Sequence, residues 1–277
     1  MKDLVSIVIP TIGRKVQVDA LLRSIGESMY RNYEIVIVDQ NHPRILGEIV
    51  VKHESRMPIL HLEVDFAGAA KARNYGAMHA RGEHLFFPDD DSELYADTLQ
   101  KFMEHAKKTG ADVLFGKCQD RTAADSAGTF SREGGYLSLK RHLNMFIEST
   151  MFIKKETFLR YLFDPSFGVG TFYGAEEAYD LVLRMLYDGV AIYYTPEARV
   201  YHPHKIINHS NQSEIRRVFS YRCGFAHLCV KHKLYRKYVS RLLKVILYMF
   251  YTIAVARKKT RYYCAELLGL LAGGVVR

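Results

Sequence analysis

Apolar runs of strand length alternate with amphipathic segments over the first 117 residues of the chain. Between the runs, apolar residues repeat at helical spacing, as Val18, Leu21, Leu22 and Ile25 do. The predicted strands are residues 4–10, 34–39, 59–64, 84–88 and 113–117, and the predicted helices cover residues 18–25, 45–53, 69–80 and 94–109. This alternation predicts an α/β fold with a mostly parallel, Rossmann-like sheet and helices on both faces.

The pattern becomes less regular after residue 117. Residues 119–136 are polar and rich in glycine, which predicts a loop. Short strands are predicted at residues 151–153, 190–194 and 198–201, and a helix at residues 176–188. Together with the regular part, these segments predict one large domain over residues 1–209.

Residues 210–277 form a region of different character. Residues 215–232 predict a basic, aromatic helix, and residues 245–256 are an unbroken apolar run of 12 residues between Lys244 and Arg257. The run is shorter than the about 20 residues that cross a bilayer. With a second apolar stretch at residues 267–276, the region predicts basic amphipathic helices that lie in a membrane interface. Packing on the larger domain, or a dimer interface, is the alternative.

The net charge of +9 comes from this C-terminal region. Residues 200–277 carry 15 Lys and Arg against 2 Asp and Glu, a net of +13, whereas the other residues carry 24 against 28, a net of −4. This asymmetry indicates an anionic partner, either a membrane surface or a nucleic acid. The apolar run at residues 245–256 does not suit a wet, charged groove, so the membrane is favoured and nucleic acid is not expected as a partner.

The number and spacing of the cysteines indicate the redox environment in which the protein works. Cys118, Cys223, Cys229 and Cys264 form no CxxC pair, and no secretory signal precedes the first predicted strand. We therefore expect a reducing cytosol and no disulfide framework.

Three adjacent carboxylates, Asp89, Asp90 and Asp91, follow the fourth predicted strand. They repel one another, so placing them together at a strand end is costly unless a cation compensates. Mg²⁺ and Mn²⁺ take oxygen ligands and bind through one or two carboxylates plus substrate phosphates. A solvated acidic turn before the next helix is the alternative. Pro10-Thr11 and Asp39-Gln40 end two other strands, and ligands bind beyond such ends.

Four segments together resemble the family 2 glycosyltransferases with a GT-A fold, of the type that builds bacterial polysaccharides and glycolipids. They are LVSIVIPTIGR at residues 4–14, EIVIVD at residues 34–39, GAAKARNYGAMHARGEHLFFPDDD at residues 68–91 and GAEEAYDLVLR at residues 174–184. The resemblance covers residues 4–204. It implies a nucleotide-sugar-binding half over residues 1–117 and an acceptor-binding half over residues 118–209.

The resemblance also implies roles for single residues. The residues expected at the nucleotide sugar are Pro10, Thr11, Arg14, Asp39, Lys71, Arg73, Asn74, Asp89 and Asp90, and those expected at a Mn²⁺ or Mg²⁺ ion are Asp91, Asp89 and His202. Lys71 and Arg73 would also offset phosphate charge. Gln40 stands where many members of the family have a second Asp, so contacts to the base differ.

An acidic pair, Glu176-Glu177, opens the helix predicted at residues 176–188. In the family such a pair supplies the base that deprotonates the acceptor hydroxyl, although carboxylates in a first turn also suit the helix dipole. This chain has Glu-Glu where Glu-Asp is usual. We take Glu177 as the first candidate base, Glu176 as the second and Asp180 as the third.

The predicted activity is therefore transfer of a sugar from a nucleotide-diphosphate sugar to an acceptor hydroxyl by metal-assisted inverting displacement. The expected acceptor is lipid-linked or a polysaccharide, and the expected location is cytoplasmic, peripheral on the inner face of the cell membrane. A nucleotidyltransferase of similar fold is the alternative, but its glycine-rich loop is missing, since residues 11–15 hold one glycine, Gly13. A basic nucleic-acid-binding protein is a second alternative. No GxGxxG follows the first strand, which disfavours a dehydrogenase.

Overall fold

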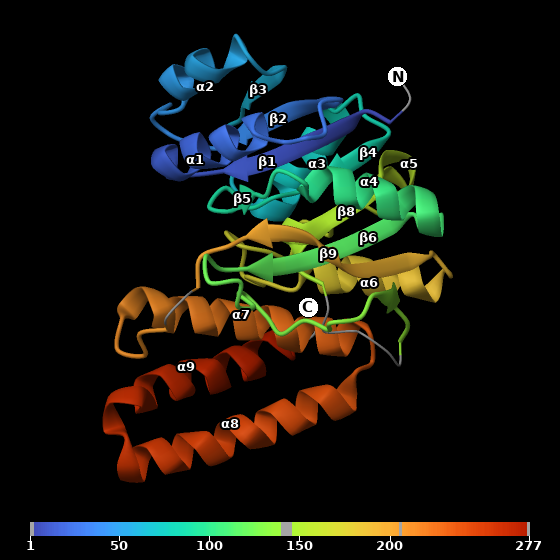
Figure 1. Ribbon diagram of the computed structural model, residues 1–277. Coiled ribbons are helices and arrows are strands. Elements are labelled where there is room, and N and C mark those ends of the chain that lie inside the picture. The colour runs from blue at the N-terminus through green and yellow to red at the C-terminus, as the bar shows by residue number, and fades with distance from the viewer. Residues whose placement is uncertain (1–2, 140–145, 205–206, 276–277) are drawn as a thin grey trace. The chain divides into compact units, whose positions relative to one another are not determined.

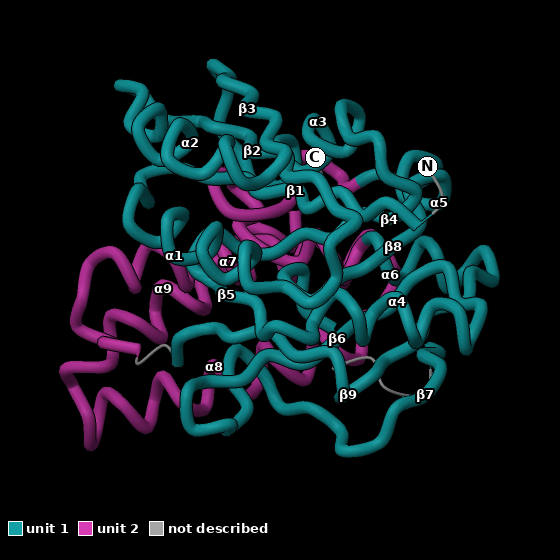
Figure 2. The backbone as a smooth tube through the Cα atoms, turned by 45° about the horizontal axis from the view of Figure 1, so that its top comes forward, with its two compact units in different colours: residues 1–162, 181–205 teal, residues 163–180, 206–277 magenta. Residues whose placement is uncertain are grey.

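The computed structural model describes residues 3–139, 146–204 and 207–275 (Figure 1). Their contacts divide the chain into two compact units, which Figure 2 colours separately. The first unit comprises Met1–Leu162 and Leu181–Lys205, and the second comprises Phe163–Asp180 and Ile206–Arg277. The second unit thus joins the C-terminal region to a short segment from the middle of the chain.

The first unit is built on one mixed sheet. Its strands are β1 (Val5–Thr11), β2 (Tyr33–Asp39), β3 (Ile59–Glu63), β4 (His84–Phe86), β5 (Glu93–Leu94), β6 (Val113–Gln119), β7 (Gly135–Tyr136), β8 (Met151–Lys154) and β9 (Ile192–Tyr201). Their order is β3-β2-β1-β4-β8-β6-β9-β5, and β7 pairs with β9. The strands β1, β2, β3 and β4 are parallel to one another, as are β6 and β9. The predicted mostly parallel α/β fold is confirmed.

Helices cover both faces of this sheet. They are α1 (Lys15–Gly26), α2 (Gly47–Glu54), α3 (Ala69–His79), α4 (Thr98–Thr109) and α5 (Lys155–Tyr161), with a 3₁₀ turn η1 (Glu148–Thr150). Alternate residues of β1 and β2, such as Ile7 and Ile35, pack with α1, α2 and α4 in the main core. The residues between them, such as Val8 and Val36, face α3 at Gly76. Because both faces are covered, β1 and β2 are buried at every position, and their sequences are mostly apolar, with the buried Ser6 and Glu34 hydrogen-bonded to each other.

The structure differs from the sequence prediction in several elements. Residues 190–194 and 198–201 were expected as two strands, but β9 runs through Pro196 as one strand. The pairing of β9 with β6 shifts register between Phe115 and Lys117, which accommodates a proline that has no N–H to donate. Helix α4 begins at Thr98, because residues 93 and 94 form β5. Strand β8 is antiparallel to both neighbours, and α5 was not predicted.

The second unit holds three long helices, α7 (Gln212–Lys231), α8 (Tyr235–Val255) and α9 (Arg257–Gly273). The side chain of Asn211 caps α7 by accepting a hydrogen bond from Ser213 N–H. Phe225, Cys229, Val245 and Leu270 belong to its small core. Helix α6 (Glu177–Tyr187) begins in this unit and continues into the first.

Helix α8 is longer than the apolar run that marks it in the sequence. It has 21 residues, and an 18-residue window has a mean hydropathy of 1.4 with 11% of its residues buried. By length and composition alone such a helix could cross a membrane, although core helices of soluble proteins meet the same criteria. The 12-residue run taken from the sequence therefore underestimates the apolar length, because the residues before Val245 extend the same helix.

Candidate active site

The first unit gathers polar groups at the carboxyl ends of three adjacent strands. Thr11 pairs in register with Asp39, at the ends of β1 and β2. Strand β4 lies on the other side of β1, and the acidic triplet Asp89, Asp90 and Asp91 follows it. Parallel strands end at one edge of a sheet, so topology alone brings these segments together.

Two arginines compensate the charge of the triplet. Arg73 Nη2 from α3 lies 2.9 Å from Asp89 Oδ1, and the Arg73 side chain is 5% exposed. Arg14, which precedes α1, lies 3.3 Å from Asp90 Oδ1 and also contacts Asp91 Oδ2. The three carboxylates are partly buried, and cations beside them offset their mutual repulsion. The structure thus brings Arg14 and Arg73 to the triplet, as a donor site needs.

Asp90 is the most enclosed of the three carboxylates. Burial raises the pKa of its carboxyl to about 6, and the charges of Asp91 and Asp89 act in the same direction while Arg14 opposes them. Burial thus favours the protonated form of this carboxyl, and a nearby positive charge such as Arg14 favours the carboxylate.

Asp89, Asp91 and His202 form a set of possible metal ligands. Their ligand atoms all lie within 4.8 Å of one another, and His202 Nε2 is 3.7 Å from Asp91 Oδ1. His202 Nδ1 lies 2.9 Å from the carbonyl oxygen of Pro203, which only accepts, so Nδ1 carries the hydrogen. In the neutral ring the lone pair is then on Nε2, the nitrogen closest to Asp91. Ligating histidines commonly have their second nitrogen held this way. Two carboxylates and an imidazole suit Mn²⁺.

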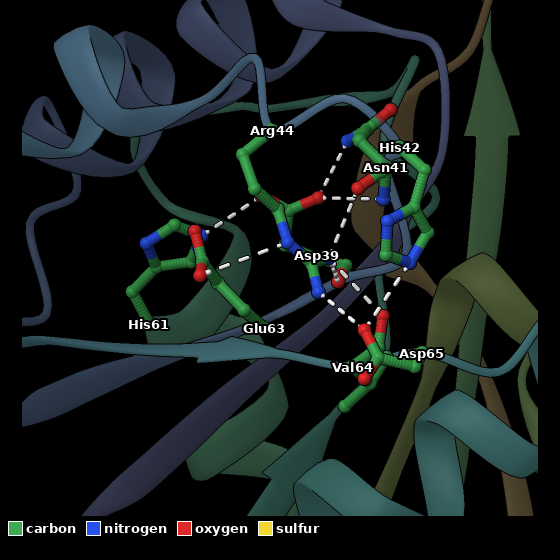
Figure 3. A network of polar contacts seen from close by, with 8 residues as sticks. All are labelled: Asp39, Asn41, His42, Arg44, His61, Glu63, Val64 and Asp65. Carbon is green, nitrogen blue, oxygen red and sulfur yellow. Dashed lines mark hydrogen bonds and ion pairs between the residues drawn. The ribbon is translucent and has the colours of Figure 1, made fainter.

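Asp39 is fully buried, and both its oxygens accept hydrogen bonds (Figure 3). Asn41 donates its backbone N–H and its side-chain N–H to Oδ1, at 2.9 and 2.6 Å, and His61 Nε2 donates to Oδ2 at 3.0 Å. Arg44 holds the same loop by donating to the carbonyl oxygens of Asp39, Asn41 and Val64. A nucleotide base would share Asp39 with these groups, so its role in base binding stays a prediction.

The ends of β2 and β3 hold a second group of possible metal ligands that the sequence did not indicate. Asp39, His61 and Glu63 have ligand atoms within 4.8 Å of one another. The pairing of β2 with β3 places Glu63 opposite Asp39. Alternation along β3 could have revealed His61 and Glu63 as neighbours on one face.

The remaining donor residues of the first unit lie in different environments. Pro10 and Thr11 are buried in β1, and Asn74 is buried in α3. Lys71 is exposed, and its ammonium lies 4.3 Å from the centre of the Phe66 ring. In the described residues, the ion pairs of the triplet are with Arg14 and Arg73 rather than with Lys71.

The three candidate bases belong to the second unit. Glu177 is the first residue of α6 and is 4% exposed, and its carboxylate packs against Gly168. A Cβ at Gly168 would lie 2.9 Å from Glu177 Oε1, and Gly168 has a φ of +101°, so this position requires glycine. Glu176 has a φ of 79°, an uncommon conformation for a side chain that is not glycine. Such strain concentrates at functional sites.

Asp180 has a different environment from the acidic pair. It is completely buried, and its Oδ1 lies 2.7 Å from Lys231 Nζ and 2.8 Å from His232 Nε2. Both partners come from the C-terminal end of α7. Each of the three acids stays a candidate, and Asp180 is held by Lys231 and His232 at hydrogen-bond distance.

A mostly parallel sheet with an arginine-compensated acidic turn beyond β4 is the arrangement expected of a GT-A type glycosyltransferase. Residues 6–171 match the family described as glycosyl transferase family 2. This match covers more than half of the chain, and the protein therefore belongs to glycosyl transferase family 2. The matched region includes the triplet and ends before Glu176 and Glu177.

Curated relatives are also glycosyltransferases. An uncharacterized glycosyltransferase of Haemophilus influenzae is 28% identical over 190 residues, 66% of this chain and 62% of that protein. A Campylobacter jejuni GalNAc(5)-diNAcBac-PP-undecaprenol beta-1,3-glucosyltransferase is 28% identical over 132 residues, 47% of this chain and 42% of that protein. The Escherichia coli glycosyl transferase WcaA is 26% identical over 246 residues, 83% of this chain and 81% of that protein. The chain thus spans less than two thirds of the first two.

Solved structures share the fold. Staphylococcus aureus TarS 1–349 in complex with UDP-GlcNAc has a TM-score of 0.62 and 17% identity, over 82% of this chain and 66% of that chain. The mannosyltransferase PcManGT of Pyrobaculum calidifontis, in complex with GDP-Man and Mn²⁺, has a TM-score of 0.57 and 17% identity, over 97% of this chain and 70% of that chain.

Proposed function

We propose that this protein transfers a sugar from a nucleotide-diphosphate sugar to an acceptor hydroxyl, with a divalent cation held by Asp89, Asp91 and His202. The observation that carries the proposal is the convergence of these three ligands from beyond β4 and β9, with Arg14 and Arg73 on the same carboxylates. Family membership supports the reaction class, and the structural neighbour solved with GDP-Man and Mn²⁺ supports the choice of ion.

The residues proposed to bind the donor have different roles, which follow from their chemistry. A bound Mn²⁺ or Mg²⁺ ion would neutralise charge on the leaving nucleoside diphosphate. Arg14 and Arg73 supply rigid, always charged guanidinium groups that bind phosphate oxygens. Pro10, Thr11, Asp39, Lys71 and Asn74 are assigned to the nucleotide, and Asp90 to the ribose. Residues 1–117 are thereby assigned to the donor and residues 118–209 to the acceptor.

Glu177 is the proposed base. It takes the proton from the acceptor hydroxyl as that oxygen attacks the anomeric carbon, which gives inversion in a single displacement. Its burial and its strained neighbour Glu176 support the choice. A base in this role contributes roughly 10²–10⁴-fold to the rate.

The proposed acceptor is lipid-linked, presented at the inner face of the cell membrane. Helix α8 exposes apolar side chains, including Leu243, Leu247 and Phe250, and α9 exposes Leu268. The exposed Arg257, Lys258 and Lys259 lie between these apolar stretches. Apolar faces beside cationic clusters favour an interface with anionic lipid. The Campylobacter relative, named for an undecaprenol-linked substrate, supports this class of acceptor.

A nucleotide-sugar screen tests the activity. Thermal unfolding of the full chain is measured with UDP-glucose, UDP-GlcNAc, UDP-galactose and GDP-mannose, each with Mn²⁺, with Mg²⁺ and with EDTA. We expect at least one sugar nucleotide to raise Tm only with a divalent ion. The same donor should release a nucleoside diphosphate on turnover, whereas a nucleotidyltransferase would release pyrophosphate. Failure of all four donors in every metal would contradict the proposal.

Vesicle flotation tests the location. The protein should float with vesicles that contain phosphatidylglycerol, less with neutral vesicles, and should be released by high salt. Retention after alkaline extraction would instead indicate that α8 spans the bilayer. If the protein did not float with vesicles but shifted an oligonucleotide in a gel, the nucleic-acid alternative would be favoured.

A further inference from the structure

One face of helix α7 packs against the segment 163–180, which carries Glu176, Glu177 and Asp180. Ser220, Gly224, His227 and Lys231 follow at intervals of four, three and four residues, so they lie on one side of the helix. The carbonyl oxygen of Ser220 accepts a hydrogen bond from Gly174 N–H at 3.1 Å. A Cβ at Gly224 would lie 2.6 Å from the carbonyl oxygen of Ala175. The backbone directly before Glu176 is therefore packed against α7.

On the same face of α7, the ring of His227 stacks on the ring of Tyr173. The His227 ring lies on the Tyr173 ring with centroids 4.0 Å apart and planes at 12°, and 5.3 Å from the Phe167 ring. Burial lowers the pKa of His227, with the nearby Lys231 charge acting in the same direction. A neutral ring is the form that stacks without a desolvation penalty.

Lys231 closes this face with a double ion pair. Its ammonium lies 2.7 Å from Asp164 Oδ2 and 2.7 Å from Asp180 Oδ1. Asp164 lies near the start of the segment 163–180, and Asp180 is one turn after Glu177 on α6. One lysine thus clamps both ends of the segment that holds Glu177. His232, the next residue, gives Asp180 a second partner.

An adjoining face of α7 is fixed by α9. Cβ atoms at Gly269 and Gly273 would meet the carbonyl oxygens of Phe219 and Cys223, so the two helices approach through their backbones. Arg222 and Arg241 both contact the buried carboxylate of Glu266. Helix α7 is held by backbone contacts on two faces, which favours a rigid support.

We propose that α7 positions the catalytic acid, and that Lys231 is the positioning residue that sets the first turn of α6 through Asp180 and Asp164. The C-terminal helices then support the catalytic acid in addition to making the membrane contact proposed above. The inference rests on the proposed function, because it takes Glu177 as the base. Lys231 acts through the carboxylates of Asp164 and Asp180 and through the backbone between them. A displacement of about 1 Å at the reacting group can lower the rate about 10²-fold.

The test compares three variants of the full chain. Lys231→Met removes the cation and keeps the chain length, Lys231→Arg keeps the cation, and Arg216→Met removes one exposed cation from the same helix as a matched control. Turnover is followed as nucleoside diphosphate release from the four sugar nucleotides named above. Hydrogen–deuterium exchange reports the backbone of residues 163–180 independently of any donor.

Lys231→Met should lower kcat by about 10- to 100-fold and leave the donor KM within about twofold, because donor contacts are unchanged. Exchange should quicken in residues 163–180 and stay unchanged in β1 and β2. Lys231→Arg should restore both readouts, and Arg216→Met should match the wild type. If Lys231→Met does not fold, Asp164→Asn, which removes one of the two pairs, must still lower kcat at constant KM.

Two outcomes separate this inference from the proposed function. Normal kcat in Lys231→Met, beside an inactive Glu177→Gln, overturns the positioning role alone, even if exchange quickens. Normal kcat in Glu177→Gln overturns the assignment of the base, and the positioning role with it.

Discussion

The two units of this protein carry acidic groups in opposite ways. In the first, the triplet at residues 89–91 lies at a sheet edge, and its charge is met by Arg14 and Arg73. In the second, Glu177 lies against Gly168 on a segment that α7 supports through Lys231 and Asp180. The first arrangement suits binding of a cation and a diphosphate, where charge matters most. The second suits proton transfer, where the placement of one carboxylate matters most.

The largest effect is expected at the acid. Glu177→Gln should lower kcat by roughly 10²–10⁴-fold, because the amide cannot take the hydroxyl proton. Donor binding, measured as the Tm shift with sugar nucleotide and Mn²⁺, should not change. Glu176→Gln is the matched control and should retain most of the turnover. The reverse order of the two variants would make Glu176 the base.

A change in the first unit should affect binding as well as rate. Asp91→Asn removes a metal ligand, and we expect roughly a 10²-fold loss of kcat together with loss of the Mn²⁺-dependent Tm shift. The control is Glu104→Gln, an exposed carboxylate of α4. If Asp91→Asn lowered kcat and left Mn²⁺-dependent donor binding intact, the contrast between binding and proton transfer would be wrong.

The basic cluster of the second unit should govern vesicle binding. Replacing Arg257, Lys258 and Lys259 by Gln should weaken binding to anionic vesicles by about 3 kcal/mol, at about 1 kcal/mol for each charge. Turnover on a water-soluble acceptor should stay the same. Removing Lys101, Lys107 and Lys108 from α4 deletes equal charge in the first unit and should have little effect. Equal losses from the two triple variants would point to net charge rather than this cluster.

The smallest effect is expected at His202. His202→Gln should weaken Mn²⁺ binding by about 10-fold, because Asp89 and Asp91 remain as ligands. The measurement is the Mn²⁺ concentration that gives half-maximal activity, with kcat at saturating Mn²⁺ nearly unchanged. A variant with wild-type metal dependence would remove His202 from the ligand set.

Much of the first unit followed from local pattern. Strand and helix alternate with clear periods, so β1, β2, β3 and the triplet beyond β4 were predictable within a residue or two. The family resemblance also pointed to Arg14, Arg73 and His202, but their partners were not visible. An ion pair between Arg73 and Asp89 depends on how α3 packs on the sheet, which no window of sequence encodes.

The sequence by itself determined the class of fold, the positions of the central strands along the chain and the clustering of acids after a strand, because these depend on periodicity and on parallel topology. Only the tertiary structure decided that β9 is one strand, that β8 runs antiparallel, and that residues 163–180 belong with the C-terminal helices. Those outcomes rest on contacts between residues far apart in the chain, such as Asp180 with Lys231, which form only when separate segments pack together.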